Sequence, residues 1–388
     1  MMKCKNILQF ALTGIIMVSL VACHQKLQNK NLNPSGFEIK RGVNLSHWLS
    51  QDFGWAPKYT YINERDIRFI DSIGYDHVRI PIDEQEMWDS TGIPIKEAFK
   101  NLTHCLDWCA KYHLRAIVDL HIVRAHHFNA GNDGATNTLW TDSTAQKNFI
   151  NIWVKLSGVL HSYPTDMVAY EILNEAVAPD NEDWNKLMNK AVAVIRTLEP
   201  YRVLIIGANM WQIAPNLQYL KLPDGDRNII LSFHTYSPLA FTHYKANWTQ
   251  IQYYKGTVHY PGQIITPGDY KKYIDTTNAS LVSQTSDARD TFNKQRLIQV
   301  FKEGLEFAKS KNLQLYCGEF GCMPTVDRKE RLAFYTDMIS AFEENNVAWC
   351  NWEFKGDFGI YFFDADKKTS LQPDTELIKV LLKHKESK

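Results

Sequence analysis

Short apolar runs alternate with longer amphipathic segments along the chain, beginning near residue 38. Eight of the apolar runs are rich in β-branched, aromatic and aliphatic residues, a composition typical of strands that are covered on both faces. The predicted strands are Glu38–Asn44, Asp76–Pro81, Leu114–His121, Met167–Glu175, Arg202–Ala208, Asn228–His234, Gln314–Glu319 and Val347–Trp352.

The segments between these runs mostly predict helices. In residues 184–198 the apolar residues follow a spacing of three or four positions, which is typical of one helix face. They are Leu187, Met188, Ala191, Val194, Ile195 and Leu198. The predicted helices are Glu64–Ile73, Ile95–Tyr112, Thr144–His161, Trp184–Leu198, Thr291–Lys311, Arg328–Asn345 and Leu371–His384. This alternation favours an α/β fold, a single (β/α)8 TIM barrel with a long insertion after the sixth strand, and a doubly wound sheet is the alternative.

The first 22 residues predict a signal peptide. Lys3 and Lys5 precede an apolar run, Ile7–Val21, which is short for a membrane span. The run ends in Leu-Val-Ala-Cys, which resembles a bacterial lipobox and predicts cleavage before Cys23 and lipidation of that residue. A plain secretory signal with a chance cysteine is the alternative. We expect a polar tether over residues 23–36, a catalytic domain over residues 37–388 and a lipid-anchored location in the bacterial cell envelope.

Composition and charge exclude several classes of partner. Lys plus Arg and Asp plus Glu are equal at 43 each, so no basic surface for nucleic acid is expected. The remaining cysteines are few, odd in number and without a Cys-x-x-Cys pair, which does not describe a disulfide framework or a structural metal site. We expect a monomer with no metal or organic cofactor, attached to a membrane only through its lipid.

Polar and aromatic residues end most of the predicted strands. In a barrel the carboxyl ends of all strands meet at one face, where TIM-barrel enzymes carry their active sites. The residues concerned are Arg79, Asp119, His121, Asn174, Glu175, His234, Tyr236, Glu319 and Trp352. Six strands that end in this way are difficult to explain by packing alone.

Glu175 and Glu319 end the fourth and seventh predicted strands. A pair of carboxyl groups is the apparatus of glycoside hydrolysis, with a separation of about 5–5.5 Å for retention of configuration and more for inversion. Burial of Glu175 would keep it protonated, as a general acid requires. Arg79 would hold Glu319 ionised, although Arg79 paired only with Asp119 is the structural alternative.

At these positions the chain resembles glycoside hydrolase family 5, the cellulase-like family of retaining enzymes on a (β/α)8 barrel. The motifs VRIPI, VDLH, ILNE, FHTY, GEFG and NWEF occur in that order from about Phe37 to the C-terminus. The resemblance implies that Glu175 is the acid/base, Glu319 the nucleophile and Asn174 the contact of the sugar 2-hydroxyl. It also implies that the −1 subsite is lined by Arg79, His121, His234, Tyr236 and Trp352.

The substrate is expected to be an oligo- or polysaccharide. Residues 236–289 form a long aromatic segment that would supply one wall of the cleft or would pack on itself. Trp48, after the first strand, is a candidate stacking platform, and His126, His127 and Trp140 are candidates for the opposite wall.

We therefore expect a retaining β-glycosidase of the endoglucanase type. A β-mannanase and a β-1,3-glucanase are alternatives because the same catalytic residues serve all three. A non-catalytic glycan-binding lipoprotein is disfavoured, since Glu175, Glu319 and Arg79 are all present.

Overall fold

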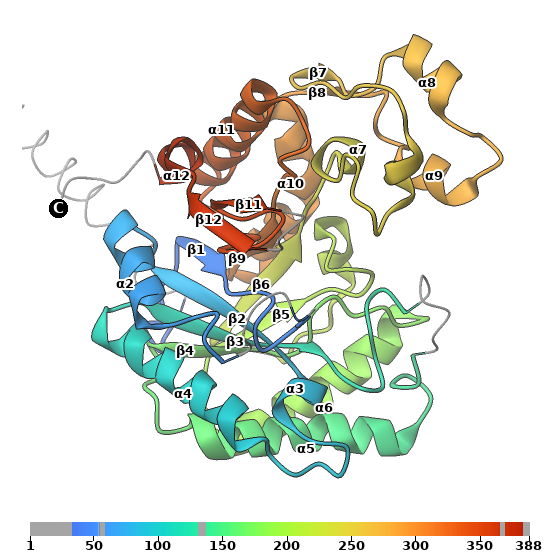
Figure 1. Cartoon of the computed structure of the whole chain (residues 1–388). Coiled ribbons are helices and arrows are strands. Elements are labelled where there is room, and N and C mark those ends of the chain that lie inside the picture. Colours follow the sequence, from blue (N-terminus) through green and yellow to red (C-terminus); the bar gives the residue numbers. More distant parts are fainter. Residues whose placement is uncertain (1–32, 53, 55–58, 131–136, 365–368, 383–388) are drawn as a thin grey trace, which may run out of the picture.

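A closed barrel of eight parallel strands forms the centre of the molecule (Figure 1). The computed structural model describes residues 33–52, 54, 59–130, 137–364 and 369–382. The barrel strands are β1 (Arg41–Asn44), β2 (His77–Asp83), β3 (Arg115–Ile122), β4 (Val168–Glu171), β5 (Leu204–Gly207), β6 (Ile229–His234), β9 (Gln314–Phe320) and β10 (Ala348–Asn351). Since β1 pairs with both β2 and β10, the predicted TIM barrel is confirmed and the open sheet is excluded.

Helices surround the barrel on its outside (Figure 1). The longer ones are α2 (Glu64–Ile73), α4 (Lys96–Lys111), α5 (Ser143–Leu160), α6 (Asn181–Leu198), α10 (Lys294–Lys311), α11 (Arg328–Glu344) and α12 (Thr375–Leu382). Several begin at an Asn or Asp whose side chain accepts a hydrogen bond from the first turn, as at Asn63 and Asp180. None of the helices within the described residues is long and apolar enough to cross a membrane.

Several predicted boundaries are wrong. β1 begins at Arg41 rather than Glu38, and α6 begins at Asn181 rather than Trp184. β4 ends at Glu171, so Glu175 lies beyond the strand rather than at its tip. The predicted helix over 291–311 begins only at Lys294, because Thr291–Phe292 is strand β8, paired with β7 (Gly262–Gln263), and Asn293 caps the helix. The predicted last helix begins at Thr375, because Leu371 lies in β12 (Thr369–Pro373), which pairs with β11 (Tyr361–Asp364). A proline at 373 also disfavours helix before it.

The apolar residues form two main cores. The larger one fills the layer between the barrel and the helices. The smaller one fills the barrel interior toward the amino ends of the strands, where Phe37 and Ile39 pack against inward residues such as Ile117, Ile205 and Tyr316. The apolar core thus closes the barrel at the amino ends of the strands, which we call the lower end. Polar groups can gather only at the opposite, upper end, where the carboxyl ends of the strands lie.

Residues 236–289 carry the short helices α7 (Leu239–Thr242), η2 (Gln250–Tyr253), α8 (Pro267–Tyr273) and α9 (Ala279–Gln284). In Figure 1, α8 and α9 lie away from the barrel. Phe241, Tyr254 and Tyr260 are buried, whereas Trp248 and Tyr253 are exposed. The segment packs part of its aromatic surface on itself, as between Tyr244 and Tyr254, and part on Phe334 of α11, which Phe241 and Tyr260 contact.

Candidate active site

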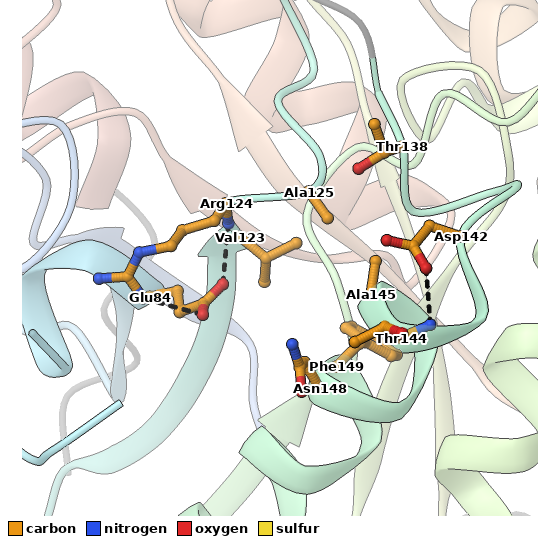
Figure 2. A pocket seen from close by; sticks show the side chains of 10 residues that line it. All are labelled: Glu84, Val123, Arg124, Ala125, Thr138, Asp142, Thr144, Ala145, Asn148 and Phe149. Atoms are coloured by element: carbon orange, nitrogen blue, oxygen red, sulfur yellow. Dashed lines mark hydrogen bonds and ion pairs between the residues drawn. The ribbon is translucent and has the colours of Figure 1, made fainter. Parts of the chain in front are cut away.

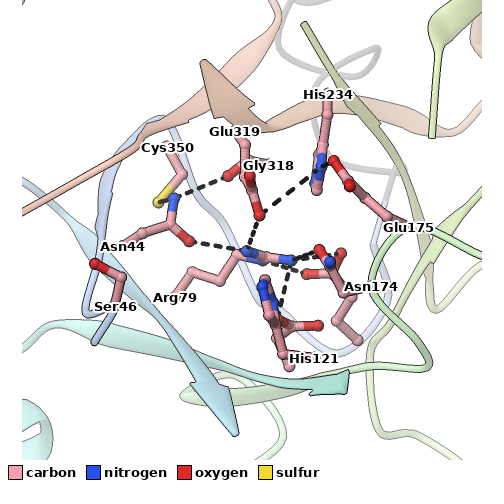
Figure 3. Close-up of polar contacts among 12 residues, drawn as sticks. Asn44, Ser46, Arg79, His121, Asn174, Glu175, His234, Gly318, Glu319 and Cys350 are labelled. Carbon is pink, nitrogen blue, oxygen red and sulfur yellow. Dashed lines mark hydrogen bonds and ion pairs between the residues drawn. The ribbon is translucent and has the colours of Figure 1, made fainter. Parts of the chain in front are cut away.

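Arg79, from β2, lies at the centre of a buried polar network (Figure 3). Its Nε and Nη2 donate to the two oxygens of Glu171 at 2.6 and 3.2 Å. Nη1 donates to Glu319 Oε1 at 2.8 Å, and Nη2 lies 3.0 Å from Asp119 Oδ2. Nη2 also donates to Asn174 Oδ1 at 2.8 Å. Arg79 thus contacts Asp119, the predicted alternative, and Glu319 at the same time.

Glu175 and Glu319 are brought together although 144 positions separate them in the sequence. One carboxylate oxygen of each lies within 4.8 Å of the other. Glu319 Oε2 accepts a hydrogen bond from the Tyr236 hydroxyl at 3.0 Å, in addition to its contact with Arg79. Glu175 Oε1 lies 2.8 Å from His234 Nδ1. The two carboxyl groups therefore have different partners, one a cation and a phenol and the other an imidazole.

Burial raises the pKa of Glu175 well above its usual range, and the charge of Glu319 raises it further. Burial also raises the pKa of Glu319, but the Arg79 guanidinium and the Tyr236 hydrogen bond counteract this. The pair can accordingly share one proton, and protonation of Glu175 is favoured over protonation of Glu319.

Burial disfavours the charged form of the two histidines of the site. Burial lowers the pKa of His121 to about 3 and that of His234 well below its usual range. His121 Nδ1 lies 2.7 Å from Asp119 Oδ2, whose carboxyl has a pKa raised to about 7 by burial. A neutral His234 must present its Nδ1 proton to an ionised Glu175 or accept the proton of a protonated one.

Two buried side-chain nitrogen atoms of the site are left for a ligand. Asn174 Nδ2 and His234 Nε2 have no hydrogen-bond partner among the described residues. An unpaired buried amide or imidazole nitrogen is costly unless something fills it. Sugar hydroxyls are suitable partners, because they both donate and accept.

Trp352 lies beside these groups. Its ring stacks on His121 with centroids 5.7 Å apart and planes inclined by 11°, and it packs with Met323, Phe358 and Tyr236. His47 meets its edge at 6.3 Å. The ring is thus fixed from several sides and retains a small exposed fraction of 8%.

Trp48 is not a stacking platform. Its side chain is fully buried in the core between barrel and helices, so it offers no ring face to a ligand. Trp140 is also largely buried, with its ring edge-to-face on Trp184, and His126 is buried beside it. The expectation for Trp48 is wrong because its ring packs in the core, whereas those for His126, His127 and Trp140 stay predictions.

The sequence interpretation missed three buried members of the network, Asn44, Glu171 and Gln212, and also the buried Glu353, which follows Trp352. Glu171 had a usable signal, because it lies two residues after the inward-facing Ala169 on the same strand. Glu353 binds the Ser46 hydroxyl and lies 3.1 Å from His47 Nε2. Gln212 had no such signal, because it comes from a loop.

Among the described residues, one cluster has ligand atoms close enough for a metal ion: Glu175, His234 and Glu319. Arg79 already supplies a positive charge to this cluster at 2.8 Å from Glu319 Oε1.

A pocket of about 240 Å³ lies elsewhere, between the end of β3 and the start of α5 (Figure 2). Arg124 and Glu84 line it opposite Asp142, and none of its lining residues belongs to the carboxylate site.

A family model described as cellulase (glycosyl hydrolase family 5) matches residues 30–357. Endoglucanase C of Acetivibrio thermocellus is 35% identical over 353 residues, which covers 89% of this chain and 99% of that protein. Cellodextrinase A of Ruminococcus flavefaciens is 27% identical over 314 residues, covering 80% of this chain and 84% of that protein. The crystal structure of endoglucanase Cel5A from Thermotoga maritima superposes with a TM-score of 0.69 at 23% identity, covering 90% and 99% of the two chains.

Proposed function

The chain belongs to glycosyl hydrolase family 5 and is a glycosidase that hydrolyses O-glycosyl compounds, and from this premise we propose that it cleaves a β-linked glucan with retention of configuration. Glu319 is the proposed nucleophile and Glu175 the proposed acid/base. The observation that carries this assignment is the proximity of two carboxylate oxygens, within 4.8 Å, in unlike surroundings. A short separation favours attack by one carboxylate over activation of an intervening water.

In the first step, a Glu319 oxygen forms a bond to the anomeric carbon while the bond to the glycosidic oxygen breaks. Arg79 and Tyr236 keep Glu319 ionised and orient it. The proton of Glu175 passes to the departing oxygen, which leaves as a sugar hydroxyl. The product is a glycosyl ester on Glu319.

In the second step, water attacks the anomeric carbon, its proton passes to the Glu175 carboxylate, and the bond to Glu319 breaks. Glu175 suits both steps because burial and, in addition, the charge of Glu319 raise its pKa. Once Glu319 is esterified that charge is gone, so the pKa of Glu175 falls and the group becomes a base.

The substrate-binding proposal rests on the open polar atoms and on the aromatic residues. Asn174 Nδ2 is proposed to donate to the 2-hydroxyl of the sugar whose bond is cleaved, and Trp352 to form the floor under that sugar. His121 and His234 contribute as neutral hydrogen-bonding groups. Trp248, 45% exposed with its ring against His243 and Phe358, is proposed as a further platform supplied by residues 236–289.

Incubation with a panel of β-1,4-glucan, β-1,3-glucan and β-mannan oligosaccharides tests this function. We expect internal cleavage of the β-1,4-glucan, with the β-anomer as the first product detected by proton NMR. Faster cleavage of β-mannan or β-1,3-glucan would replace the proposed substrate. An α-anomer would contradict retention, and oligosaccharide binding without turnover would contradict the assignment of catalysis to this site.

Lipid anchoring at Cys23 is a separate proposal. It rests on the sequence Leu-Val-Ala-Cys at the end of the apolar run, and Cys23 lies outside the described residues. The anchor would hold a monomeric enzyme at the bacterial cell envelope. Fractionation of cells that express the wild type and Cys23→Ser tests it: the wild type should sediment with membranes, and equal sedimentation of both would contradict lipidation.

A further inference from the structure

The turn after β5 has an unusual backbone. Met210, Trp211 and Gln212 are consecutive non-glycine residues with φ of 63°, 59° and 53°. Each such residue costs about 1–2 kcal/mol relative to a right-handed conformation. Strain of this kind persists where surrounding contacts over-determine it, and it is concentrated at functional sites.

The contacts that hold this turn come from the loop that carries Glu175. The backbone N–H groups of Met210 and Trp211 both donate to Ala176 O, at 2.8 and 3.3 Å. The side chain of Asn209 accepts from the Ala178 N–H at 2.7 Å and donates back to its carbonyl at 3.0 Å. On the other side, the His234 N–H donates to Gln212 O at 3.0 Å.

As a result, the Gln212 side chain enters the barrel, where it is almost fully buried. Its place exists because Gly207, at the end of β5, has no side chain. A Cβ at Gly207 would lie 2.3 Å from Gln212 Cδ and Cγ. A residue from a loop therefore occupies the position that an inward side chain of β5 would take.

The amide of Gln212 uses both of its polar atoms. Oε1 accepts from the Glu175 backbone N–H at 2.7 Å. Nε2 donates to Glu171 Oε1 at 3.3 Å and to Ser232 Oγ at 3.1 Å. Glu175 itself has a φ of 43°, so its backbone is also strained and needs an external restraint.

We propose that Gln212 is a positioning residue for the acid/base Glu175. It fixes the strained backbone from which the Glu175 carboxyl reaches the glycosidic oxygen. Its second contact, with Glu171, ties this restraint to Arg79 and hence to the Glu319 side of the site. The hydrogen bond from the Glu175 backbone is the shortest of the three that the Gln212 side chain makes, so we expect the principal effect of its loss on proton donation by Glu175.

Two substrates separate this role from a general structural one. Cleavage of cellopentaose needs a proton from Glu175, because the departing sugar is a poor leaving group. Cleavage of 2,4-dinitrophenyl β-cellobioside does not, since dinitrophenolate leaves without a proton. The value of kcat/KM reports the steps up to bond cleavage for both. Their ratio within one variant is independent of how much of the protein is folded.

Gln212→Met keeps the volume and removes the hydrogen bonds. We expect its kcat/KM for cellopentaose to fall about 100-fold, the scale of a misplacement near 1 Å, and that for the dinitrophenyl substrate to fall less than about threefold. Gly207→Ala should change the ratio in the same direction, because the new Cβ displaces the Gln212 amide. Gln218→Met, at an exposed glutamine of the neighbouring helix η1 (Ala214–Tyr219), is the matched control and should leave both values unchanged.

Equal losses on both substrates, or no loss on either, would overturn the proposal, since neither is specific to proton donation. The inference rests on the proposed function, and the two can fail separately. A wild-type protein that cleaves neither substrate contradicts the proposed function. An active wild type with an unchanged ratio in Gln212→Met contradicts only the role of Gln212.

Discussion

The two ends of the barrel interior differ sharply, although the same strands build both. Toward the amino ends, β3, β4 and β6 point Ile117, Ala169 and Ile230 inward, and these pack with Phe37. Two residues further along, β3 and β4 point Asp119 and Glu171 toward Arg79 instead. One end is an ordinary apolar core, and the other buries charges that have no packing value.

This difference separates stability from function. Burial of apolar side chains stabilises the lower end, whereas burial of several carboxyl groups around one arginine costs free energy unless protons or further contacts compensate. Changes at the amino ends should therefore lower stability and leave the chemistry intact. At the carboxyl ends, removal of a carboxyl group should alter the chemistry more than the stability, whereas removal of the shared arginine should alter both.

The largest effect is expected from the carboxyl pair. Glu319→Ala and Glu175→Ala should each lower kcat for an unactivated oligosaccharide by at least about 10⁴-fold, because each removes the proposed nucleophile or the proposed proton donor. The thermal unfolding midpoint should stay the same or rise, since a buried carboxyl is removed. Activity assays and calorimetry measure both. Glu303→Ala, on the exposed face of α10, is the control, and substantial activity in either catalytic variant would contradict the assignment.

Arg79→Met should affect both quantities. Loss of the guanidinium leaves Asp119, Glu171 and Glu319 without their shared cation, which should cost about 3–5 kcal/mol of stability and lower kcat about 10²–10³-fold. The stability loss should be greater at pH 8 than at pH 5, where protons can neutralise the carboxylates. Urea unfolding at the two pH values measures this, with Arg68→Met on α2 as the exposed control. An equal loss at both pH values contradicts the electrostatic account.

Phe37→Ala should have the opposite profile. It leaves a cavity in the lower core and should destabilise the protein by about 3–5 kcal/mol. We expect kcat at a temperature where the variant is folded to change less than about twofold, because additivity holds for distant sites. Tyr201→Ala, at a ring 69% exposed, should cost less than about 0.5 kcal/mol. A large fall in kcat would show that the two ends are coupled.

The smallest effect concerns pH and stability. The pKa of Asp119 is raised to about 7 by burial, so its contribution to stability is present below pH 4 and is lost as pH rises toward 7. Asp119→Asn should reduce the fall in the unfolding midpoint between pH 4 and pH 8. Differential scanning calorimetry measures it, and Asp71→Asn, exposed on α2, should behave as the wild type. An unchanged pH dependence in Asp119→Asn contradicts burial as the cause.

The pH profile of activity should have two limbs, one at high pH and one at low pH. It should fall as pH rises through the elevated pKa of Glu175, which must be protonated in the first step. It should also fall as pH drops through the pKa of Glu319, which must be ionised and lies above its usual value. The acid limb is therefore expected above the ordinary pKa of a glutamate side chain.

Much of the fold could be predicted because each element satisfies a local rule. Strands covered on both faces need apolar runs, and helices on a barrel need one apolar stripe, so both appear in the pattern of residues. The predicted end of the fourth strand was wrong, because Ile172 and Leu173 are as apolar as strand residues. They follow β4, which ends at Glu171, as buried residues outside the strand. The predicted exposure of the Trp48 side chain was wrong for a similar reason. The sequence near a strand end is the same whether an aromatic residue packs in the core or faces a ligand.

The sequence by itself determined the barrel, the family motifs and the polar residues at the ends of the strands, because each depends on residues close to one another in the chain. Only the tertiary structure decided that Glu175 and Glu319 lie within 4.8 Å, that Arg79 contacts three carboxyl groups, and that Gln212 takes the space beside Gly207. These contacts arise when the barrel closes, and closure joins segments whose spacing in the sequence carries no record of their distance in space.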